Sequence, residues 1–210
     1  RHAFKSLFNG FSVAATPAEL GRIRQMAGVK AVHPVRTIPM PQAAPGNPDL
    51  FTALSMTGAD VVQSELGFTG RGVKVGVIDS GIDYDNADLG GDGVARSNSP
   101  VFPTRRVITG WDFVGDAYNA DPTSPGYDPV PKPDPYPDDC GGHGTHVAGI
   151  IGASGFVTGV APSVKFGAYR VFGCEGSTDV VVDAIDWAVD HDMDVINMSL
   201  GSPFGSATAP

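Results

Sequence analysis

Apolar residues follow two spacings along this chain, and the two spacings alternate. Runs of strand length that are rich in apolar residues occur at residues 73–79, 106–114, 164–171 and 194–200. The run at 73–79 is rich in β-branched residues, which is typical of a parallel strand buried on both faces. Residues 180–189 instead carry apolar side chains at the three- and four-residue spacing of a helix. The alternation predicts an α/β fold with a parallel central sheet flanked by helices.

The most unusual stretch is residues 140–152, where a glycine-rich loop leads into an apolar helix. This helix contains Gly144, Gly149 and Gly152, although each glycine costs about 1 kcal/mol relative to alanine. Such a helix is expected to be buried and to approach neighbouring backbone closely. His143 lies in its first turn, where the helix dipole favours a neutral imidazole, the form a general base needs. A histidine filling the core is the equally weighted alternative.

The first part of the chain predicts a separate small unit. Residues 4–14 form a strand pattern interrupted by an Asn-Gly turn, and residues 16–19 form a capping box with proline at the first helical position. The helix is expected to end by Gly28, and residues 29–35 predict a second strand. We therefore assign residues 1–38 to a small α+β unit without its own core. Residues 39–57, which include several prolines, predict a linker and processing region.

Charge is distributed unevenly between the two parts of the chain. Residues 1–36 contain six basic residues and one acidic residue, and residues 37–210 contain eight basic and twenty-two acidic residues, which gives the net charge of -9. The two parts are therefore expected to attract each other, and the acidic part argues against nucleic-acid binding. No apolar run approaches the roughly 18 residues of a membrane span. The sequence starts at Arg1 and ends in a loop pattern, so we expect a fragment of a longer protein.

A long loop is predicted at residues 115–139, which contain seven prolines and six aspartates. Aspartate clusters can bind calcium, but these show no recognisable ligand spacing, so a solvated acidic loop is the main expectation. His143 and His146 form a possible metal pair, but the sequence offers no third ligand. We therefore assign no metal, and structural calcium remains possible without an assigned site.

Three segments together resemble the signature segments of the subtilisin-like serine proteases. They are residues 77–83 (Val-Ile-Asp-Ser-Gly-Ile-Asp), 143–149 (His-Gly-Thr-His-Val-Ala-Gly) and 194–201 (Asp-Val-Ile-Asn-Met-Ser-Leu-Gly). The resemblance covers about residues 58–210, the expected amino-terminal part of a catalytic domain. Residues 1–38 look like the end of the inhibitory propeptide of these enzymes. The long loop and residues 173–177 look most like secreted microbial members of the minor extracellular protease type.

The resemblance implies roles for individual residues. Asp79 matches the aspartate and His143 the histidine of an Asp-His-Ser triad. Two segments match the strands that bind an extended peptide substrate on either side: Gly176-Ser177 and Ser199-Leu200-Gly201. The family's nucleophilic serine lies downstream of the last matched segment. The resemblance thus implies a serine endopeptidase acting on proteins or peptides, with the propeptide as intramolecular inhibitor and no cofactor needed for catalysis. These 210 residues alone are expected to be inactive.

Further expectations rest on the same resemblance. Cys140 and Cys174 lie on loops that are adjacent in the family, which implies a disulfide and an extracellular protein, with two free thiols as the alternative. Residues 86–89 read Asn-Ala-Asp-Leu where the family often has His-Pro-Asp-Leu, and Asp88 aligns with a calcium ligand of some members. A protease-like pseudoenzyme that binds or regulates other proteins is the alternative function. The presence of both Asp79 and His143 favours the enzyme.

Overall fold

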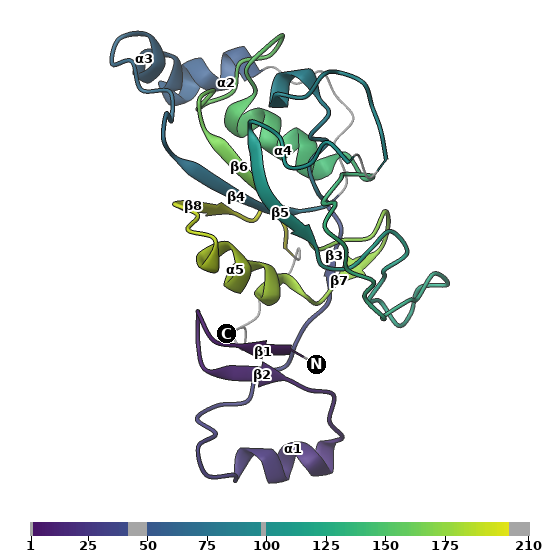
Figure 1. The fold of residues 1–210 in the computed structure, drawn as a ribbon. Helices are drawn as coiled ribbons and strands as arrows, with labels where there is room; N and C mark the ends of the chain where they lie inside the picture. Colours follow the sequence, from purple (N-terminus) through teal and green to yellow (C-terminus); the bar gives the residue numbers. More distant parts are fainter. Residues whose placement is uncertain (1, 42–49, 98–99, 202–210) are drawn as a thin grey trace.

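A computed structural model describes residues 2–41, 50–97 and 100–201 of the 210-residue chain. Its centre is a parallel sheet with the strand order β5-β6-β4-β8 (Figure 1). The bounds are Lys74–Asp79 for β4, Val107–Asp112 for β5, Lys165–Arg170 for β6 and Val195–Asn197 for β8. The four predicted apolar runs therefore form one sheet, and the predicted α/β class is confirmed.

Helices cover both faces of this sheet. On one face, Val75 and Val77 of β4 share an apolar cluster with Val147 and Ala148 of α4 (His143–Gly152). On the other face, Ile78 belongs to the cluster that includes residues of α5 (Val181–Asp190). Successive side chains of a strand point to opposite faces, so the continuous apolar run of β4 fills both clusters. Among the described residues, no helix is long and apolar enough to cross a membrane.

Strand β8 lies at the edge of the sheet and pairs only with β4 in the described part of the chain. The strand predicted over 194–200 is shorter in the structure, because regular pairing stops at Asn197. The side chain of Val195 is about half exposed at this edge. An apolar strand with one open edge and an exposed face is a favourable surface for further packing.

The amino-terminal unit (residues 2–37) is a hairpin followed by a helix. Strands β1 (His2–Phe4) and β2 (Gly10–Ser12) pair antiparallel, and α1 covers Pro17–Arg24. The predicted capping box is confirmed, since Thr16 and Glu19 bond each other's backbone amides. The predicted strand at 29–35 is wrong: this segment has no strand partner in the described part of the chain, and apolar composition alone does not make a strand.

The segment predicted as a linker contains regular structure at both ends. Strand β3 (Ile38–Pro39) pairs antiparallel with β7 (Ser177–Thr178), far along the sequence. Helix α2 covers Leu50–Thr57 and is followed by α3 (Ala59–Ser64), which packs against it. A 3₁₀ turn, η1, covers Ala87–Leu89. The prolines that suggested a linker largely precede α2, and residues 42–49 lie outside the described residues.

Candidate active site

A row of charged side chains lies at the carboxyl ends of three neighbouring strands. Asp79 of β4 is opposite Arg170 of β6, and Arg170 is opposite Asp112 of β5. All three are buried almost completely. Functional sites of open α/β sheets lie beyond this edge, where parallel strands end together. The sheet thus brings the predicted catalytic aspartate to that edge, next to an arginine that the sequence analysis did not single out.

The structure brings Asp79 and His143 together. The Nδ1 atom of His143 lies 2.7 Å from Oδ1 of Asp79, and the Ser80 amide donates to the same oxygen at 2.7 Å. Burial raises the pKa of Asp79, although the hydrogen bonds from His143 and Ser80 act in the opposite direction. An acceptor at Nδ1 favours the tautomer that carries its proton there, which leaves Nε2 free to accept a proton. The pair therefore has the arrangement of a carboxylate that orients a general base.

Asp139 organises the turn that places His143 at the start of α4. Its Oδ1 accepts the amides of Gly141 (2.9 Å) and Gly142 (2.8 Å), while its Oδ2 accepts the amide (2.9 Å) and hydroxyl (2.6 Å) of Thr145. These amides are donors that a helix start otherwise leaves unpaired. Sequence reasoning missed Asp139, although a carboxylate shortly before a helix start is the usual signal for such a cap.

Two of the three glycines in α4 are required by close packing. A Cβ at Gly144 would lie 2.1 Å from the carbonyl oxygen of Gly81 and 3.1 Å from Cβ of Asp79. A Cβ at Gly152 would lie 2.7 Å from Val164. The predicted close approach is confirmed at these positions and is wrong at Gly149, where a Cβ would meet nothing within 4 Å. Gly144 therefore allows α4 to meet the end of β4, which sets the distance from His143 to Asp79.

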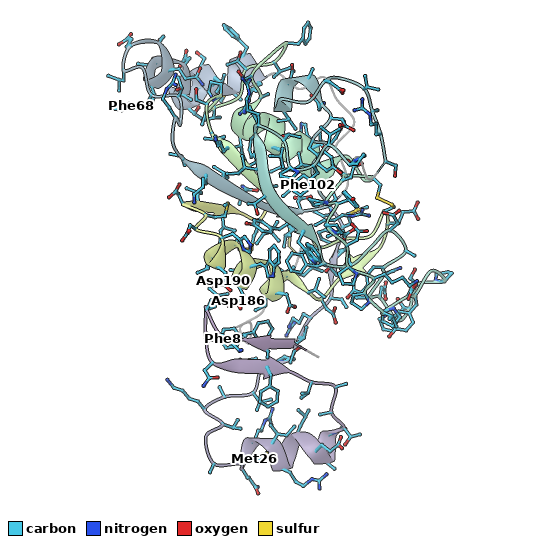
Figure 2. The ribbon with its side chains drawn as sticks, viewed as in Figure 1. Phe8, Met26, Phe68, Phe102, Asp186 and Asp190 are labelled. Atoms are coloured by element: carbon cyan, nitrogen blue, oxygen red, sulfur yellow. A yellow bond between two sulfur atoms is a disulfide. The ribbon has the colours of Figure 1, made fainter. Side chains whose placement is uncertain are left out.

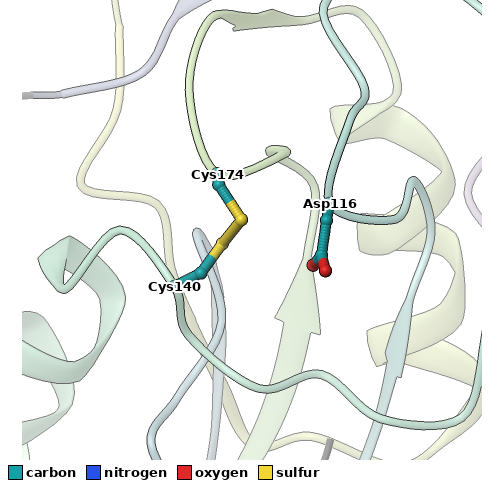
Figure 3. Close-up of side chains that lie close together, drawn as sticks. All are labelled: Asp116, Cys140 and Cys174. Atoms are coloured by element: carbon teal, nitrogen blue, oxygen red, sulfur yellow. A yellow bond between two sulfur atoms is a disulfide. The ribbon is translucent and has the colours of Figure 1, made fainter. Parts of the chain in front are cut away.

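The predicted disulfide between Cys140 and Cys174 is confirmed, with a Cα–Cα distance of 5.2 Å (Figure 3). It joins the loop before α4 to the loop after β6, so it links the histidine segment to the segment that leads into β7. Asp116 lies beside the two sulfur atoms, as Figure 3 shows. Because both sulfurs are bonded to each other, this group offers no thiolate for a metal.

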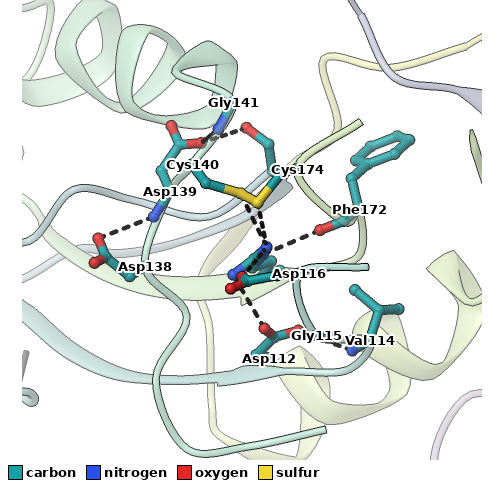
Figure 4. Close-up of polar contacts among 12 residues, drawn as sticks. Asp112, Val114, Gly115, Asp116, Asp138, Asp139, Cys140, Gly141, Phe172 and Cys174 are labelled. Atoms are coloured by element: carbon teal, nitrogen blue, oxygen red, sulfur yellow. Dashed lines mark hydrogen bonds and ion pairs between the residues drawn. A yellow bond between two sulfur atoms is a disulfide. The ribbon is translucent and has the colours of Figure 1, made fainter. Parts of the chain in front are cut away.

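Arg170 lies beneath the disulfide and makes contacts on several sides. Its guanidinium forms ion pairs with Asp112 (3.2 Å) and Asp116 (2.9 Å) and contacts the sulfur of Cys140 (3.0 Å). Its Nε donates to the carbonyl of Phe172 at 3.0 Å. Figure 4 shows Asp112 and Asp116 below the disulfide and Asp139 above it. A buried cation between two carboxylates is therefore part of the support of the histidine loop.

The predicted substrate-binding residues lie on two segments. Gly176 directly precedes β7 and Ser177 is its first residue, and the carbonyl of Gly176 accepts the Met40 amide at 2.8 Å. Residues 199–201 follow the edge strand β8. The hydroxyl of Ser199 donates to the side chain of Asn197 at 2.9 Å, and Leu200 packs against the apolar cluster of the α5 face.

Asp88 does not have the surroundings of a calcium ligand. Its Oδ1 accepts the amide of Phe156 at 2.7 Å, and its Oδ2 accepts the amide of Val157 at 2.9 Å. Amide hydrogens directed at both carboxylate oxygens disfavour a cation there. Asp88 instead fixes the turn after α4, and we assign no calcium to it.

Comparisons with known proteins agree with this geometry. The sequence profile described as "Subtilase family" matches residues 70–209, and that described as "Peptidase inhibitor I9" matches residues 1–39. Minor extracellular protease Vpr of Bacillus subtilis (strain 168) is 32% identical over 95% of this chain and 23% of its own length. Subtilisin DY of Bacillus licheniformis is 38% identical over 70% of this chain and 43% of its own length.

Among solved structures, a cold adapted subtilisin-like serine proteinase is 32% identical and aligns over 66% of this chain and 40% of its own, with a TM-score of 0.46. The chain spans less than half the length of each of these curated relatives.

Proposed function

Because the chain belongs to the subtilase family, we propose that it is part of a serine endopeptidase precursor, made with its own inhibitor unit. The proposed reaction is hydrolysis of peptide bonds in proteins by an Asp-His-Ser triad. The observation that carries the proposal is the 2.7 Å contact between His143 Nδ1 and the buried Asp79 carboxylate. A general base that is oriented by a buried carboxylate is the arrangement that activates a serine hydroxyl.

In this mechanism, Nε2 of His143 takes the proton of the attacking serine and later delivers it to the leaving amine. Asp79 keeps the imidazole in the reactive tautomer and stabilises the imidazolium that forms. The nucleophilic serine is proposed to come from a part of the full-length protein outside these 210 residues. Residues 1–210 alone are therefore proposed to lack peptidase activity.

Substrate binding is proposed to use strand addition to β7, and β3 supports this proposal. The segment Ile38–Met40 pairs with residues 176–178 in the way an extended peptide would. The sulfur of Met40 lies 3.2 Å from where a Cβ at Gly141 would be, close to the histidine loop. A propeptide tail in this position blocks substrate, so the amino-terminal unit is proposed to inhibit the enzyme until cleavage.

The disulfide suits a protein that is exported to an oxidising environment, and we propose an extracellular location. No cofactor is proposed for catalysis. The pseudoenzyme alternative requires loss of the nucleophile, and the intact Asp79–His143 pair gives no reason for such a loss.

A test uses the full-length protein after propeptide removal. We expect His143→Ala to lower kcat by about 10⁴-fold or more, because the base is lost. His191→Asn, at the C-cap of α5 and away from the candidate site, is the matched control and should retain activity. An active-site serine reagent should label the full-length enzyme but not residues 1–210. Full activity of the His143 variant, or labelling of residues 1–210, would contradict the proposal.

A further inference from the structure

The long loop at 115–139 is not simply a solvated acidic segment. Its first part enters the core, where Tyr118 is 2%, Asn119 6% and Ala120 6% exposed. Tyr118 and Ala120 belong to the apolar cluster on the α5 face. Figure 1 shows the loop running beside β7. A buried loop segment in this place has a structural consequence for the strand next to it.

The loop and β3 bond to opposite edges of β7. On the loop side, Ser177 donates its amide to Oδ1 of Asn119 at 3.1 Å, and Ala120 donates its amide to the Ser177 carbonyl at 2.9 Å. On the other side, the carbonyl of Gly176 accepts the amide of Met40. The N–H and C=O of one strand residue point to the same edge, and successive residues alternate between the two edges. Ser177 therefore bonds the loop, whereas Gly176 bonds the paired tail.

Other contacts tie the same two segments together. The amide of Cys174 donates to the carbonyl of Asp116 at 2.9 Å, and the hydroxyl of Tyr118 bonds the carboxylate of Asp179. Asn119 itself is held in place, because its Oδ1 also accepts the amide of Asp121 at 3.0 Å. A Cβ at Gly176, which has a φ of +101°, would lie 2.4 Å from Cγ of Asn119. The asparagine therefore packs directly on the backbone that precedes β7.

We infer that Asn119 is a positioning residue for the peptide-binding strand, and this inference rests on the proposed function. A two-residue strand such as β7 has too little pairing to keep its own place. The long loop supplies the missing edge, and it leaves the opposite edge at a fixed position for an incoming extended peptide. Asn119 does not contact the reacting atoms. It acts through Ser177 on the binding of peptides and of the segment Ile38–Met40.

The first test measures amide hydrogen exchange in residues 1–210, without any catalysis. Asn119→Leu removes the acceptor for Ser177, whereas Asn119→Asp keeps an acceptor oxygen of the same shape. If Asn119 positions β7, losing its hydrogen bond to Ser177 also weakens the pairing of Met40 with Gly176. We expect about tenfold faster exchange of the Met40 amide in the leucine variant, the equivalent of one hydrogen bond. The aspartate variant should stay near the original rate. So should Tyr127→Ser, at an exposed position of the same loop.

The amide of Val77, in the centre of the sheet, is the internal reference. An unchanged Met40 rate in Asn119→Leu would overturn the inference. An equal rise at Val77 would also overturn it, because the variant would then have lost stability in general.

The second test uses the full-length enzyme with a long peptide substrate and a short ester substrate. Asn119→Leu should raise KM for the long peptide about tenfold and leave kcat for the ester unchanged, since one strand hydrogen bond is at stake. Asn119→Asp should restore KM. An equal loss with both substrates would mean that Asn119 acts on the triad, against the inference. If the full-length protein has no peptidase activity but the exchange result holds, the proposed function fails and the positioning of the tail stands.

Discussion

The amino-terminal unit and the sheet around β4 reach their structures by different routes. In the unit, α1 has no buried residue, and Met26, which follows this helix, is 60% exposed (Figure 2). Its elements depend on local signals, namely the capping box at Thr16 and the turn between β1 and β2. In the sheet, residues distant in sequence share two buried clusters. Local bonds define the shape of the unit, whereas burial stabilises the sheet.

The two regions meet where the hairpin lies against α5. The Asp186 carboxylate accepts the amides of Ser6 (3.0 Å) and Leu7 (2.8 Å), and Asp190 accepts the hydroxyl of Ser6 at 2.5 Å. Figure 2 shows Asp186 and Asp190 on the side of α5 that faces the hairpin. At this contact, acidic side chains of the sheet region therefore act as hydrogen-bond acceptors for neutral groups of the amino-terminal unit. Attraction between the oppositely charged parts stays a prediction.

The largest expected effect comes from Arg170→Met, which removes a buried positive charge from the sheet region. The variant leaves Asp112 buried without its cation, and we expect a loss of about 3–5 kcal/mol in the free energy of unfolding. Urea unfolding followed by tryptophan fluorescence measures this, because Trp111 and Trp187 both lie in the sheet region. The control is Lys132→Met, which removes an exposed ion pair with Asp128. We expect the control to lose about 1 kcal/mol or less, as exposed pairs contribute little. Similar losses in both variants would mean that burial of Arg170 does not matter.

A smaller effect, with opposite signs at two sites, is expected within α4. Gly144→Ala should destabilise the sheet region by about 2 kcal/mol, because the new methyl group meets the carbonyl of Gly81. Gly149→Ala meets nothing and should stabilise it by up to about 1 kcal/mol, through helix propensity alone. Thermal unfolding of the two variants provides the measurement. Equal shifts would contradict the view that packing, not propensity, decides the first turn of this helix.

The sequence predicted well those features that depend on local pattern or on recognised motifs. The capping box and the four strands of the sheet follow from residue order and spacing. The meeting of Asp79 with His143 was expected from the resemblance to the family's signature segments. The strand expected at 29–35 failed because a strand needs a partner, and apolar composition does not supply one. Helix α2 was missed because prolines before it suggested a linker through the whole segment.

The support of the site escaped prediction because it depends on distant pairing. Arg170 contacts Asp112 and Cys140 only after three strands and two loops have assembled. Asn119 bonds Ser177, and β3 pairs with β7, although each pair is far apart in sequence and no periodic pattern links its members. Motifs pointed to the proposed reacting residues Asp79 and His143, whereas only the folded chain shows the residues that hold them.

The smallest expected effect comes from a substitution that weakens the contact between the two regions and leaves the fold of each unchanged. Asp186→Ala removes the acceptor for Ser6 and Leu7, and we expect the exchange of these two amides to rise about tenfold, the equivalent of roughly 1.4 kcal/mol. The free energy of unfolding of the sheet region in urea should change by less than about 0.5 kcal/mol, as expected for a surface substitution.

Asp186→Asn keeps an acceptor oxygen without the charge. If the asparagine variant protects Ser6 and Leu7, hydrogen bonding holds the unit; if it exchanges like the alanine variant, charge does. The control Asp192→Asn keeps a residue type that tolerates the positive φ of 54° there and should leave both regions unchanged. A loss of sheet stability in Asp186→Ala as large as the change at Ser6 would mean that the two regions unfold as one, and that burial in the sheet also stabilises the unit.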